Sequence, residues 1–586
     1  MNTRLIDVAL GRQPADAVIK GGILINVHSA QIYHTDIAIA DGRIASIGPL
    51  PESVYGQATT IIDAAGMYLA PGFIDAHIHI ESSMLTYTEF AKMVVRHGTT
   101  AVASDLMEVT IVSGVEGMKE VLRESETTPV RLYYPVPAFM EESHLQTTGS
   151  TLYPEMMEEL IQLPQAVGLA EVLGMPLLAG SPASAAILAL ARAQHKTVEG
   201  HAPALRAEQI NAFAGAGINS EHESTTKEEA LMKVRVGMRV LMREGSASTD
   251  LLECLRAITE EGADARRCSM VSDDIDALHI KQCGHLDHKV RLAIRAGIDP
   301  ITAIRMVSLH PAENFLIDHE CGSIAPGRVA DVVFLSSLED CRVERVMVAG
   351  EMVVEQGCLI KQIQAPEYSG LLMNTIHLKR KATPEDMVIT LTDQKRSARV
   401  HVIGASSVSL LTEALEADLP VRGGVVEPDV ANDVLRIACV ERYGKHGGIG
   451  RSFVKGFGLR EGAIAISVGH DHHNITVVGS DPADMAIAVN RIDELQGGFV
   501  LVNQGEVLYE LALPICGLLS PDDGEAVADR LSEFIQKLET LGCRMPSPNV
   551  TLSFITLIFI PKLAISDLGL FDVTQFKLIA PVISST

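Results

Sequence analysis

The chain has 586 residues, enough for two or three domains that each bury an apolar core. Its 48 basic and 74 acidic side chains give a formal net charge of −26, which repels phosphate backbones and argues against a nucleic-acid partner. Hydrophobic residues make up 47% and charged residues 21% of the chain, a balance typical of a globular protein and not of a disordered one.

The N-terminal region is predicted to form short strands joined by turns. Stretches such as 17–22 and 35–40 are apolar or alternate with polar residues, and glycine-containing turns separate them. The same pattern returns at 322–335. We therefore predict one small composite β-domain built from residues 1–70 and 315–364.

The middle region, 71–314, alternates segments with the patterns of strands and of helices. Amphipathic runs such as 88–97 and 208–216 separate eight strand candidates. These candidates are 70–80, 100–105, 130–137, 166–173, 197–202, 218–223, 239–243 and 269–273. Eight such units over about 250 residues are what a (β/α)8 barrel of the TIM type requires. A doubly wound open sheet shows the same alternation, so periodicity alone does not decide between the two.

A further domain is predicted after the barrel. The stretch 365–387 is polar and contains proline, as a linker does. From 388 to 586, strand-like and helix-like segments mix again, and we interpret this region as a separate C-terminal α/β domain. Its most apolar run, 551–560, is too short for a membrane span of about 20 residues, so we interpret it as a buried strand.

We expect a cytoplasmic protein with no membrane partner. The nine cysteines are scattered without a CxxC pair, and their odd number favours reduced thiols. The segment Met1 to Asp7 lacks the apolar run of a secretory signal.

His77 and His79 carry the strongest chemical signal. They end the first strand candidate of the barrel, in Asp75-Ala76-His77-Ile78-His79. Side chains at i and i+2 of a strand point to the same side, so the two imidazoles are presented together. Neutral imidazole suits a borderline divalent metal. On its own, an HxH pair is explained equally well by two histidines of the core or the surface that bind no metal.

Ligand-type side chains also end four later strand candidates. These are Glu171, His201, His222 and Asp273. The C-terminal ends of the strands converge on one face of a (β/α)8 barrel, so these side chains can meet the HxH pair there. Four histidines and two carboxylates suffice for two metal ions that share a carboxylate.

This pattern resembles the amidohydrolase superfamily and, within it, the adenine deaminase family. Residues 324–327 and 330–333 resemble the segment through which the chain of that superfamily re-enters its β-domain after the barrel. The resemblance to adenine deaminases rests on seven stretches in the barrel and the C-terminal domain. They are 79–84, 243–247, 272–274, 284–287, 441–447, 454–459 and 470–475. It covers nearly the whole chain and implies a metal-dependent enzyme that hydrolyses adenine to hypoxanthine and ammonia.

The resemblance also implies two divalent metal ions, manganese or iron, and we predict their ligands. One ion is assigned to His77, His79 and Asp273 and the other to His201 and His222, with Glu171 as the bridge. Asp273 is expected to take the proton of the attacking water as well.

Further side chains are candidates with a competing, non-catalytic interpretation. Glu108 and His285 are predicted to be catalytic, and Glu81, Arg243 and Asp105 to bind the substrate. Supporting carboxylates and a salt-bridge arginine would look the same in the sequence. His470, His472 and His473 form an HxHH cluster that either binds metal or, as we favour, belongs to a loop packed over the barrel mouth.

One position departs from the family pattern, in which Asp-Pro-His-Glu follows the second strand. This chain has Asp105-Leu106-Met107-Glu108 there. A thioether cannot donate a hydrogen bond or relay a proton as an imidazole can. We therefore predict slower turnover of adenine or a preference for another heterocycle, unless neighbouring side chains compensate.

The predicted partner is a small-molecule purine substrate, with no nucleic acid and no membrane, and a homo-oligomer is expected. Two alternatives stay open. One is a deaminase or cyclic amidohydrolase that acts on another N-heterocycle, and the other is a catalytically inactive scaffold with the amidohydrolase fold. A scaffold would have lost metal ligands, whereas all six ligand positions are filled here.

Overall fold

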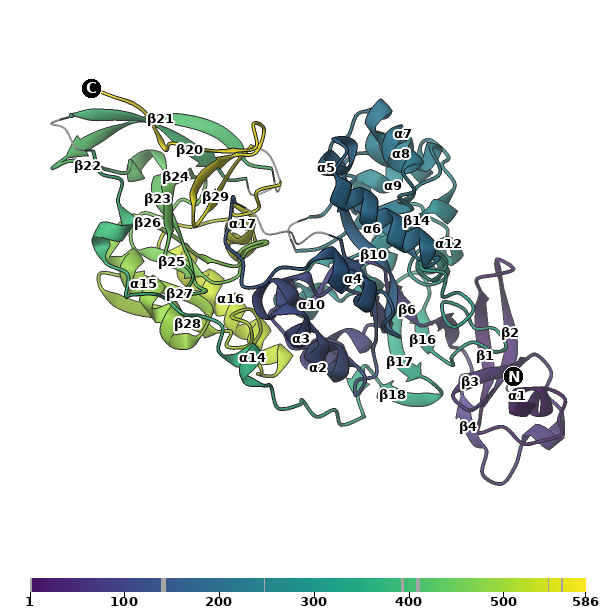
Figure 1. Ribbon diagram of the computed structural model, residues 1–586. Coiled ribbons are helices and arrows are strands. Elements are labelled where there is room, and N and C mark those ends of the chain that lie inside the picture. The colour runs from purple at the N-terminus through teal and green to yellow at the C-terminus, as the bar shows by residue number, and fades with distance from the viewer. Residues whose placement is uncertain are drawn as a thin grey trace.

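The computed structural model describes residues 3–138, 144–246, 248–391, 395–406, 411–545, 547–559 and 562–586. Along the chain it has an N-terminal β-sheet region, a barrel and a C-terminal α/β region, which Figure 1 shows side by side. The predicted domain limits, 1–70 with 315–364, 71–314 and 388–586, stay predictions.

Strands from both sides of the barrel segment build one nine-stranded sheet. The first group, which follows helix α1 (Thr3–Ala9), is β1 (Ala17–Asn26), β2 (Gln31–Ala40), β3 (Arg43–Ile47), β4 (Thr60–Asp63) and β5 (Tyr68–Pro71). The second group is β16 (Val332–Ser337), β17 (Arg342–Val348), β18 (Glu351–Glu355) and β19 (Cys358–Leu359). The order is β19-β18-β17-β16-β5-β1-β2-β3, with β4 paired to β1. Strand β5 is the last strand of this sheet before the barrel, and β16 is the first one after it. Because β16 pairs antiparallel with β5, the chain re-enters the sheet beside the strand from which it entered the barrel.

Eight parallel strands form the wall of the barrel. In order they are β6 (Phe73–Asp75), β8 (Thr99–Ala103), β9 (Arg131–Pro137), β10 (Ala166–Leu173), β11 (Thr197–His201), β12 (Ser220–Glu221), β13 (Arg239–Arg243) and β14 (Cys268–Val271). The last strand continues into β15 (Asp273–Asp274), which pairs in parallel with β7 (Ile78–His79) just after β6. This pair joins the first strand to the last and nearly closes the ring. The predicted (β/α)8 barrel is therefore confirmed over the open-sheet alternative.

Helices follow the barrel strands on the outside. They are α2 (Tyr87–Val95), α3 (Met107–Ser125), α4 (Pro154–Leu160), α5 (Gly174–Leu178), α6 (Pro182–Ala193), α7 (Ala207–Gly215), α8 (Lys227–Arg235), α9 (Leu251–Thr259), α10 (Ala277–Cys283), α11 (Leu286–Arg295), α12 (Pro300–Met306) and α13 (Leu309–Asn314). The predicted strand at 70–80 is divided into the end of β5, β6 and β7, and Asp75 accepts a hydrogen bond of 3.3 Å from the amide of His77 in the gap between β6 and β7. A short 3-10 helix, Ile80–Ser83, then leads away from the barrel.

The C-terminal region is built on a ten-stranded sheet. Its strands are β20 (Ser397–Gly404), β21 (Glu413–Arg422), β22 (Val425–Val426), β23 (Val434–Val440), β24 (Ile449–Lys455), β25 (Ala463–Ile466), β26 (Ile475–Gly479), β27 (Gly498–Asn503), β28 (Glu506–Ala512) and β32 (Val582–Ser585). The order is β22-β21-β20-β24-β23-β26-β25-β27-β28, with β32 paired to β20. Helices α15 (Pro482–Leu495) and α16 (Gly524–Thr540) pack against its strands. A small sheet of β29 (Leu563–Ser566), β30 (Gly569–Asp572) and β31 (Lys577–Ile579) completes the region, and α14 (Gly370–Met373) lies in the linker.

The strand predicted at 551–560 is wrong. Helix α17 (Pro548–Phe554) covers the first part of this stretch, and Ile560 lies outside the described residues. A short apolar run does not distinguish a buried strand from a buried helix. Pro548 in the first turn favours the helix, because a helix start needs no amide hydrogen from that residue.

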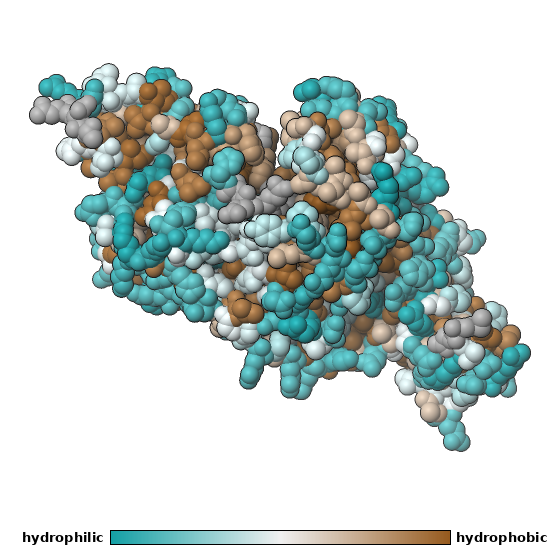
Figure 2. Space-filling model, in the orientation of Figure 1, coloured by the Kyte–Doolittle hydropathy of each residue, from teal (hydrophilic) through white to brown (hydrophobic). Residues whose placement is uncertain are grey.

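The C-terminal region packs directly on the barrel. Helix α16 contacts α10 and α2, and one cluster of buried apolar side chains includes residues of both regions. Ion pairs reinforce this contact, with Lys281 Nζ 2.6 Å from Asp529 and Arg96 2.6 Å from Glu525. Hydrophilic residues predominate on the face shown in Figure 2, with hydrophobic patches between them on both regions. Along the described residues, none of the helices combines the length and apolar character that a bilayer span requires.

Candidate active site

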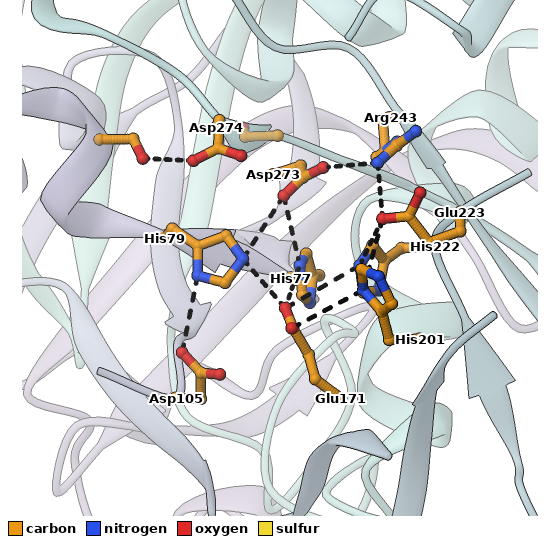
Figure 3. A network of polar contacts seen from close by, with 12 residues as sticks. His77, His79, Asp105, Glu171, His201, His222, Glu223, Arg243, Asp273 and Asp274 are labelled. Atoms are coloured by element: carbon orange, nitrogen blue, oxygen red, sulfur yellow. Dashed lines mark hydrogen bonds and ion pairs between the residues drawn. The ribbon is translucent and has the colours of Figure 1, made fainter. Parts of the chain in front are cut away.

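All six predicted metal ligands meet in one cluster at the C-terminal ends of the barrel strands. Figure 3 shows their side chains pointing toward one another. The cluster comprises His77, His79, Glu171, His201, His222 and Asp273. They come from five different places around the barrel wall, and the nearly closed ring of strands brings them together.

Glu171 lies at the centre of this cluster. Its Oε1 is 3.0 Å from Nε2 of His79, 3.7 Å from Nε2 of His77 and 3.9 Å from Nε2 of His222. Its Oε2 is 3.8 Å from Nδ1 of His201. One carboxylate thus reaches all four imidazoles, as the predicted bridging role requires.

Asp273 faces the two histidines of the first strand. Its Oδ1 is 3.4 Å from Nε2 of His77 and 3.6 Å from Nε2 of His79. Its Oδ2 accepts a hydrogen bond of 3.0 Å from Arg243 Nη1. One oxygen therefore belongs to the ligand cluster while the other is held by a buried guanidinium.

The donor set suits divalent cations. Groups such as His77, His79 and Asp273 have ligand atoms within 4.8 Å of one another. Nε2 of His77 and both ring nitrogens of His201 are buried without a hydrogen bond among the described residues. Buried polar atoms normally have a hydrogen-bond partner. Imidazole nitrogens that lack one and lie beside several carboxylates are therefore arranged as metal ligands are. The residues thus fit the predicted pair of ions.

The backbone is strained at the two carboxylate ligands. Glu171 has a φ of 53° and Asp273 a φ of 57°, in the left-handed region that non-glycine residues rarely adopt. The pairing of β10 with β11 also shifts register between Leu169 and Val172, on either side of Glu171. A bulge of this kind redirects one side chain, and strain of this kind is concentrated at functional sites.

The electrostatics of the cluster favour added positive charge. Burial raises the pKa of Glu171, but its hydrogen bond to His79 and the charges of the imidazoles lower it to about 2. For the imidazole of His77, burial lowers the pKa, but the charge of Glu199 raises it to about 9. The carboxylates thus stabilise positive charge on their neighbours, which a divalent cation also supplies.

Sequence reasoning missed Glu199. Its Oε1 lies 2.8 Å from Nδ1 of both His77 and His222, and it is almost fully buried. An acceptor at Nδ1 leaves Nε2 as the nitrogen available to a metal. A signal was present, because Glu199 lies two residues before His201 in the same strand and therefore on the same side.

Glu223 was missed as well. Its Oε1 is 3.3 Å from Nε2 of His222, 3.6 Å from Nδ1 of His201 and 2.9 Å from Arg243 Nη1. Arg243 also pairs with Asp250 at 3.1 Å, in addition to Asp273. Although Arg243 lines the cavity, it holds three carboxylates, so its predicted contact with substrate stays a prediction.

The ligand cluster lies in the wall of a cavity that residues of the C-terminal region also line. Side chains of both regions line it. Its apolar lining is Met107, Leu173, Phe554, Leu557 and Phe559, and polar groups beside the ligands are Glu108, Asp274, His470 and Asp471. Among the described residues, both the barrel and the C-terminal α/β region therefore contribute side chains to the active-site cavity.

Glu108 joins the barrel to the histidine loop at 470–475. Its Oε1 accepts a hydrogen bond of 2.9 Å from Nδ1 of His470, and its Oε2 accepts one from Nε2 of His473. Gly469 donates its amide hydrogen to Nδ1 of His473, which fits a neutral ring with its hydrogen on Nε2. The loop thus contacts the barrel at the cavity, and because the ligand atoms of Glu108, His470 and His473 lie within 4.8 Å of one another, the alternative of a metal site stays open. His472 is buried away from the cavity, 3.9 Å from Cys439.

Three other predicted residues, Glu81, Asp105 and His285, do not line the cavity. Glu81 accepts a hydrogen bond of 3.3 Å from the amide of Val109, and burial raises its pKa to about 7. Asp105 Oδ1 is 3.7 Å from Nδ1 of His79, and burial raises the pKa of this carboxyl to about 8. His285 lies fully buried between Thr99 Oγ1, at 2.8 Å, and Ser272 Oγ, at 3.0 Å. Direct roles for these three in the reaction stay predictions.

Family models and relatives match most of the chain. The model of the adenine deaminase C-terminal domain matches residues 409–577, and that of the amidohydrolase family matches 68–353. "Adenine deaminase" of Moorella thermoacetica is 40% identical over 578 residues, or 98% of this chain and 97% of the relative. "Adenine deaminase 3" of Rhizobium meliloti is 40% identical over 580 residues, with the same coverage of 98% and 97%. "Adenine deaminase 1" of Carboxydothermus hydrogenoformans is 40% identical over 597 residues, or 99% and 98% of the two chains.

Proposed function

Because the chain belongs to the adenine deaminase family of amidohydrolases, we propose that it hydrolyses adenine to hypoxanthine and ammonia. The observation that carries this proposal is the cluster of four imidazoles around Glu171 and Asp273 at the barrel mouth. An inactive scaffold would not be expected to retain a complete set of ligands with strained backbone at both carboxylates.

The cluster would hold two divalent ions, and manganese or iron is proposed for both positions. Their ligands would be His77, His79 and Asp273 for one ion and His201 and His222 for the other, with Glu171 between them. Imidazole and carboxylate donors together are compatible with either metal. When bound, such ions lower the pKa of water to about 7 and thereby supply a hydroxide nucleophile at neutral pH.

Asp273 is the proposed proton carrier. Attack of water at C6 of adenine forms a C–O bond, and loss of ammonia breaks the C6–N bond. The proton released by the water must therefore reach the ring or the leaving amine. Asp273 faces the ligand cluster with one oxygen, while Arg243 at 3.0 Å holds the other. Burial raises the pKa of Asp273, but the hydrogen bond to His77 and the charge of Arg243 lower it well below its usual range. The carboxylate is therefore ionised before the attack, as a proton carrier must be, although a pKa this low makes it a weaker base than a group that titrates near neutral pH.

The cavity matches a small planar heterocycle. Phe554, Leu557 and Met107 contribute apolar surface to the cavity lining, and His470 and Asp471 contribute polar atoms. Phe554 and Leu557 in this lining come from the C-terminal region. Those residues would also exclude bulk water from the reacting carbon.

Metal analysis coupled to an ammonia assay tests the proposal. Purified protein loaded with manganese or iron should contain about two ions per chain and release ammonia from adenine in a panel of purines and pyrimidines. Ammonia release from another heterocycle alone would favour the alternative substrate class. No release from any of them, with two ions bound, would favour the scaffold. The cytoplasmic location and homo-oligomeric state expected from the sequence stay predictions.

A further inference from the structure

A second group of metal-ligating side chains lies outside the active site. His279 and Cys283 are four residues apart on α10, and His288 follows on α11. Residues spaced i and i+4 share one face of a helix. The ligand atoms of the three side chains lie within 4.8 Å of one another, and the two imidazole centroids are 5.9 Å apart.

This trio is separate from the ligand cluster at the barrel mouth. None of its three residues lines the active-site cavity. His285, which lies between them in the sequence, turns inward to Ser272 instead. All three side chains are half-buried, so they are shielded and still reachable from solvent.

The state of the two imidazoles suits a metal, whereas burial raises the pKa of the Cys283 thiol, so that its proton leaves only when a metal binds. Nε2 of His279 is buried and has no hydrogen-bond partner among the described residues. Burial and the charge of Lys289 lower the pKa of both imidazoles, His279 and His288, to about 4. The rings are therefore neutral, the form in which imidazole binds metals. No proton has to leave either ring before a metal binds.

We propose that His279, Cys283 and His288 form a third metal site, selective for a borderline cation of the zinc type. One thiolate and two imidazoles are donors that zinc and cobalt prefer and that magnesium and calcium do not. The thiol proton of Cys283 leaves on binding, and the thiolate offsets part of the charge of the cation and of Lys289. A water molecule completes the tetrahedral coordination of such a three-ligand site.

The position of the trio gives the ion a structural role. Glycine at position 284, with a φ of 100°, ends α10 and leads into α11. A cation bound to both helices would fix this turn. The other face of α10 carries Lys281, which pairs with Asp529 and Glu525 of α16. The ion would therefore stiffen the helix on which part of the C-terminal region docks.

Cobalt substitution tests this site without reference to enzyme activity. The full-length protein is stripped of metal and titrated with Co2+ while the near-ultraviolet spectrum is recorded. A thiolate ligand produces a sulfur-to-cobalt charge-transfer band, and the predicted ligands at the barrel mouth include no cysteine. We expect the band in the natural protein and in Cys358→Ser, which removes an exposed thiol. We expect no band in Cys283→Ser.

A second variant guards against misfolding and against a chance contact. His288→Gln should keep the circular dichroism of the natural protein and raise the Kd of Co2+ at this site at least tenfold, seen as a right-shifted titration of the band. Absence of the band in the natural protein, or its persistence in Cys283→Ser, would overturn the proposal. So would an unchanged Kd in His288→Gln. Because no readout depends on adenine, failure of the proposed function leaves this test intact.

Discussion

The imidazoles of His77 and His222 lie face to face, with ring centroids 3.8 Å apart and an interplanar angle of 18°. Nδ1 of each ring donates a hydrogen bond of 2.8 Å to the same oxygen of Glu199. Two predicted ligands from distant strands are thus oriented by one buried carboxylate, which turns the Nε2 atoms of both toward Glu171. The shared acceptor couples the two predicted metal positions.

Glu199→Gln should weaken metal binding without removing a ligand. An amide cannot accept two N–H groups with the strength of a carboxylate, and loss of such supporting contacts typically costs 10–100-fold in metal affinity. Metal content after dialysis against a graded series of chelator concentrations measures the change. Glu124→Gln, at a buried carboxylate that accepts from Thr88 far from the cluster, is the matched control. Equal retention of metal by the two variants would contradict an orienting role for Glu199.

Replacement of both His77 and His79 by asparagine should strip at least one ion per chain. The variant removes both imidazoles that lie within 3.6 Å of Asp273 Oδ1 and leaves the second group of ligands in place. Elemental analysis of the purified double variant, beside the natural protein, gives the number of ions. Unchanged metal content with a native circular dichroism spectrum would overturn the ligand assignment.

Asp273 and its neighbour Asp274 can be distinguished by matched substitutions. Asp273→Asn should lower kcat by about 10²–10⁴-fold, because the geometry is similar but proton acceptance is lost. Asp274 lies 3.5 Å from Nε2 of His470 and accepts a hydrogen bond from Ser82, outside the ligand group. Asp274→Asn should therefore have the smaller effect on kcat. If Asp274→Asn were inactive and Asp273→Asn were not, the wrong carboxylate has been assigned.

The six predicted ligands lie together in the structure, whereas the carboxylates that contact them, Glu199 and Glu223, were not predicted. His77, His79 and Asp273 were found because a barrel places strand ends on one face, and the period of a strand identifies the side. Glu199 and Glu223 are not predicted metal ligands themselves but contact the imidazoles of predicted ligands. Which imidazoles they contact is visible only in the folded structure. The contact of Glu108 with the histidine loop joins residues 362 positions apart, which no local pattern encodes.

The same limit applies to secondary structure. Strands at 166–173 and 239–243 were predicted with the bounds that the structure has, because apolar runs of that length between breaks are typical of buried strands. The run at 551–560 has a similar composition but begins after Pro548, and its first part, up to Phe554, belongs to helix α17 beside the active-site cavity. Pro548 at the helix start, which lies outside the predicted run, favours the helical form.

The pair of Glu108 and His470 should stabilise the contact between the barrel and the C-terminal region. Both side chains are buried, so removal of one partner leaves an uncompensated group, which typically costs ~3–5 kcal/mol. We expect a loss of that order in the free energy of unfolding for Glu108→Gln and for His470→Gln at pH 7, measured by urea denaturation. The double variant should lose much less than the sum of the two. Additive losses would contradict a direct coupling.

The pH dependence of this pair has a defined sign. Burial lowers the pKa of His470, but the charges of Glu108 and Asp274 raise it to about 10. Its contribution to stability is therefore fully present below pH 6.5 and is lost as the pH rises through about 10. Burial raises the pKa of Glu108, but His470 and His473 lower it well below 4.5, so its contribution is lost in acid. Natural protein should lose more stability between pH 8 and 10.5 than His470→Gln, and parallel curves would refute this assignment.

Met107→His should raise kcat/KM for adenine. Met107 is 2% exposed, begins α3 and lines the active-site cavity, and its amide donates a hydrogen bond of 3.1 Å to Asp105. Its thioether cannot hydrogen-bond the ring or relay a proton, and one such participant is typically worth about 10²–10⁴-fold in rate. Ammonia release from adenine and from a panel of heterocycles, by the natural protein and the variant, measures the effect. Met107→Leu, which keeps the apolar volume, is the control and should behave like the natural protein. Equal turnover of adenine by Met107→His and Met107→Leu would show that position 107 is structural and that its departure from the family pattern does not affect the reaction.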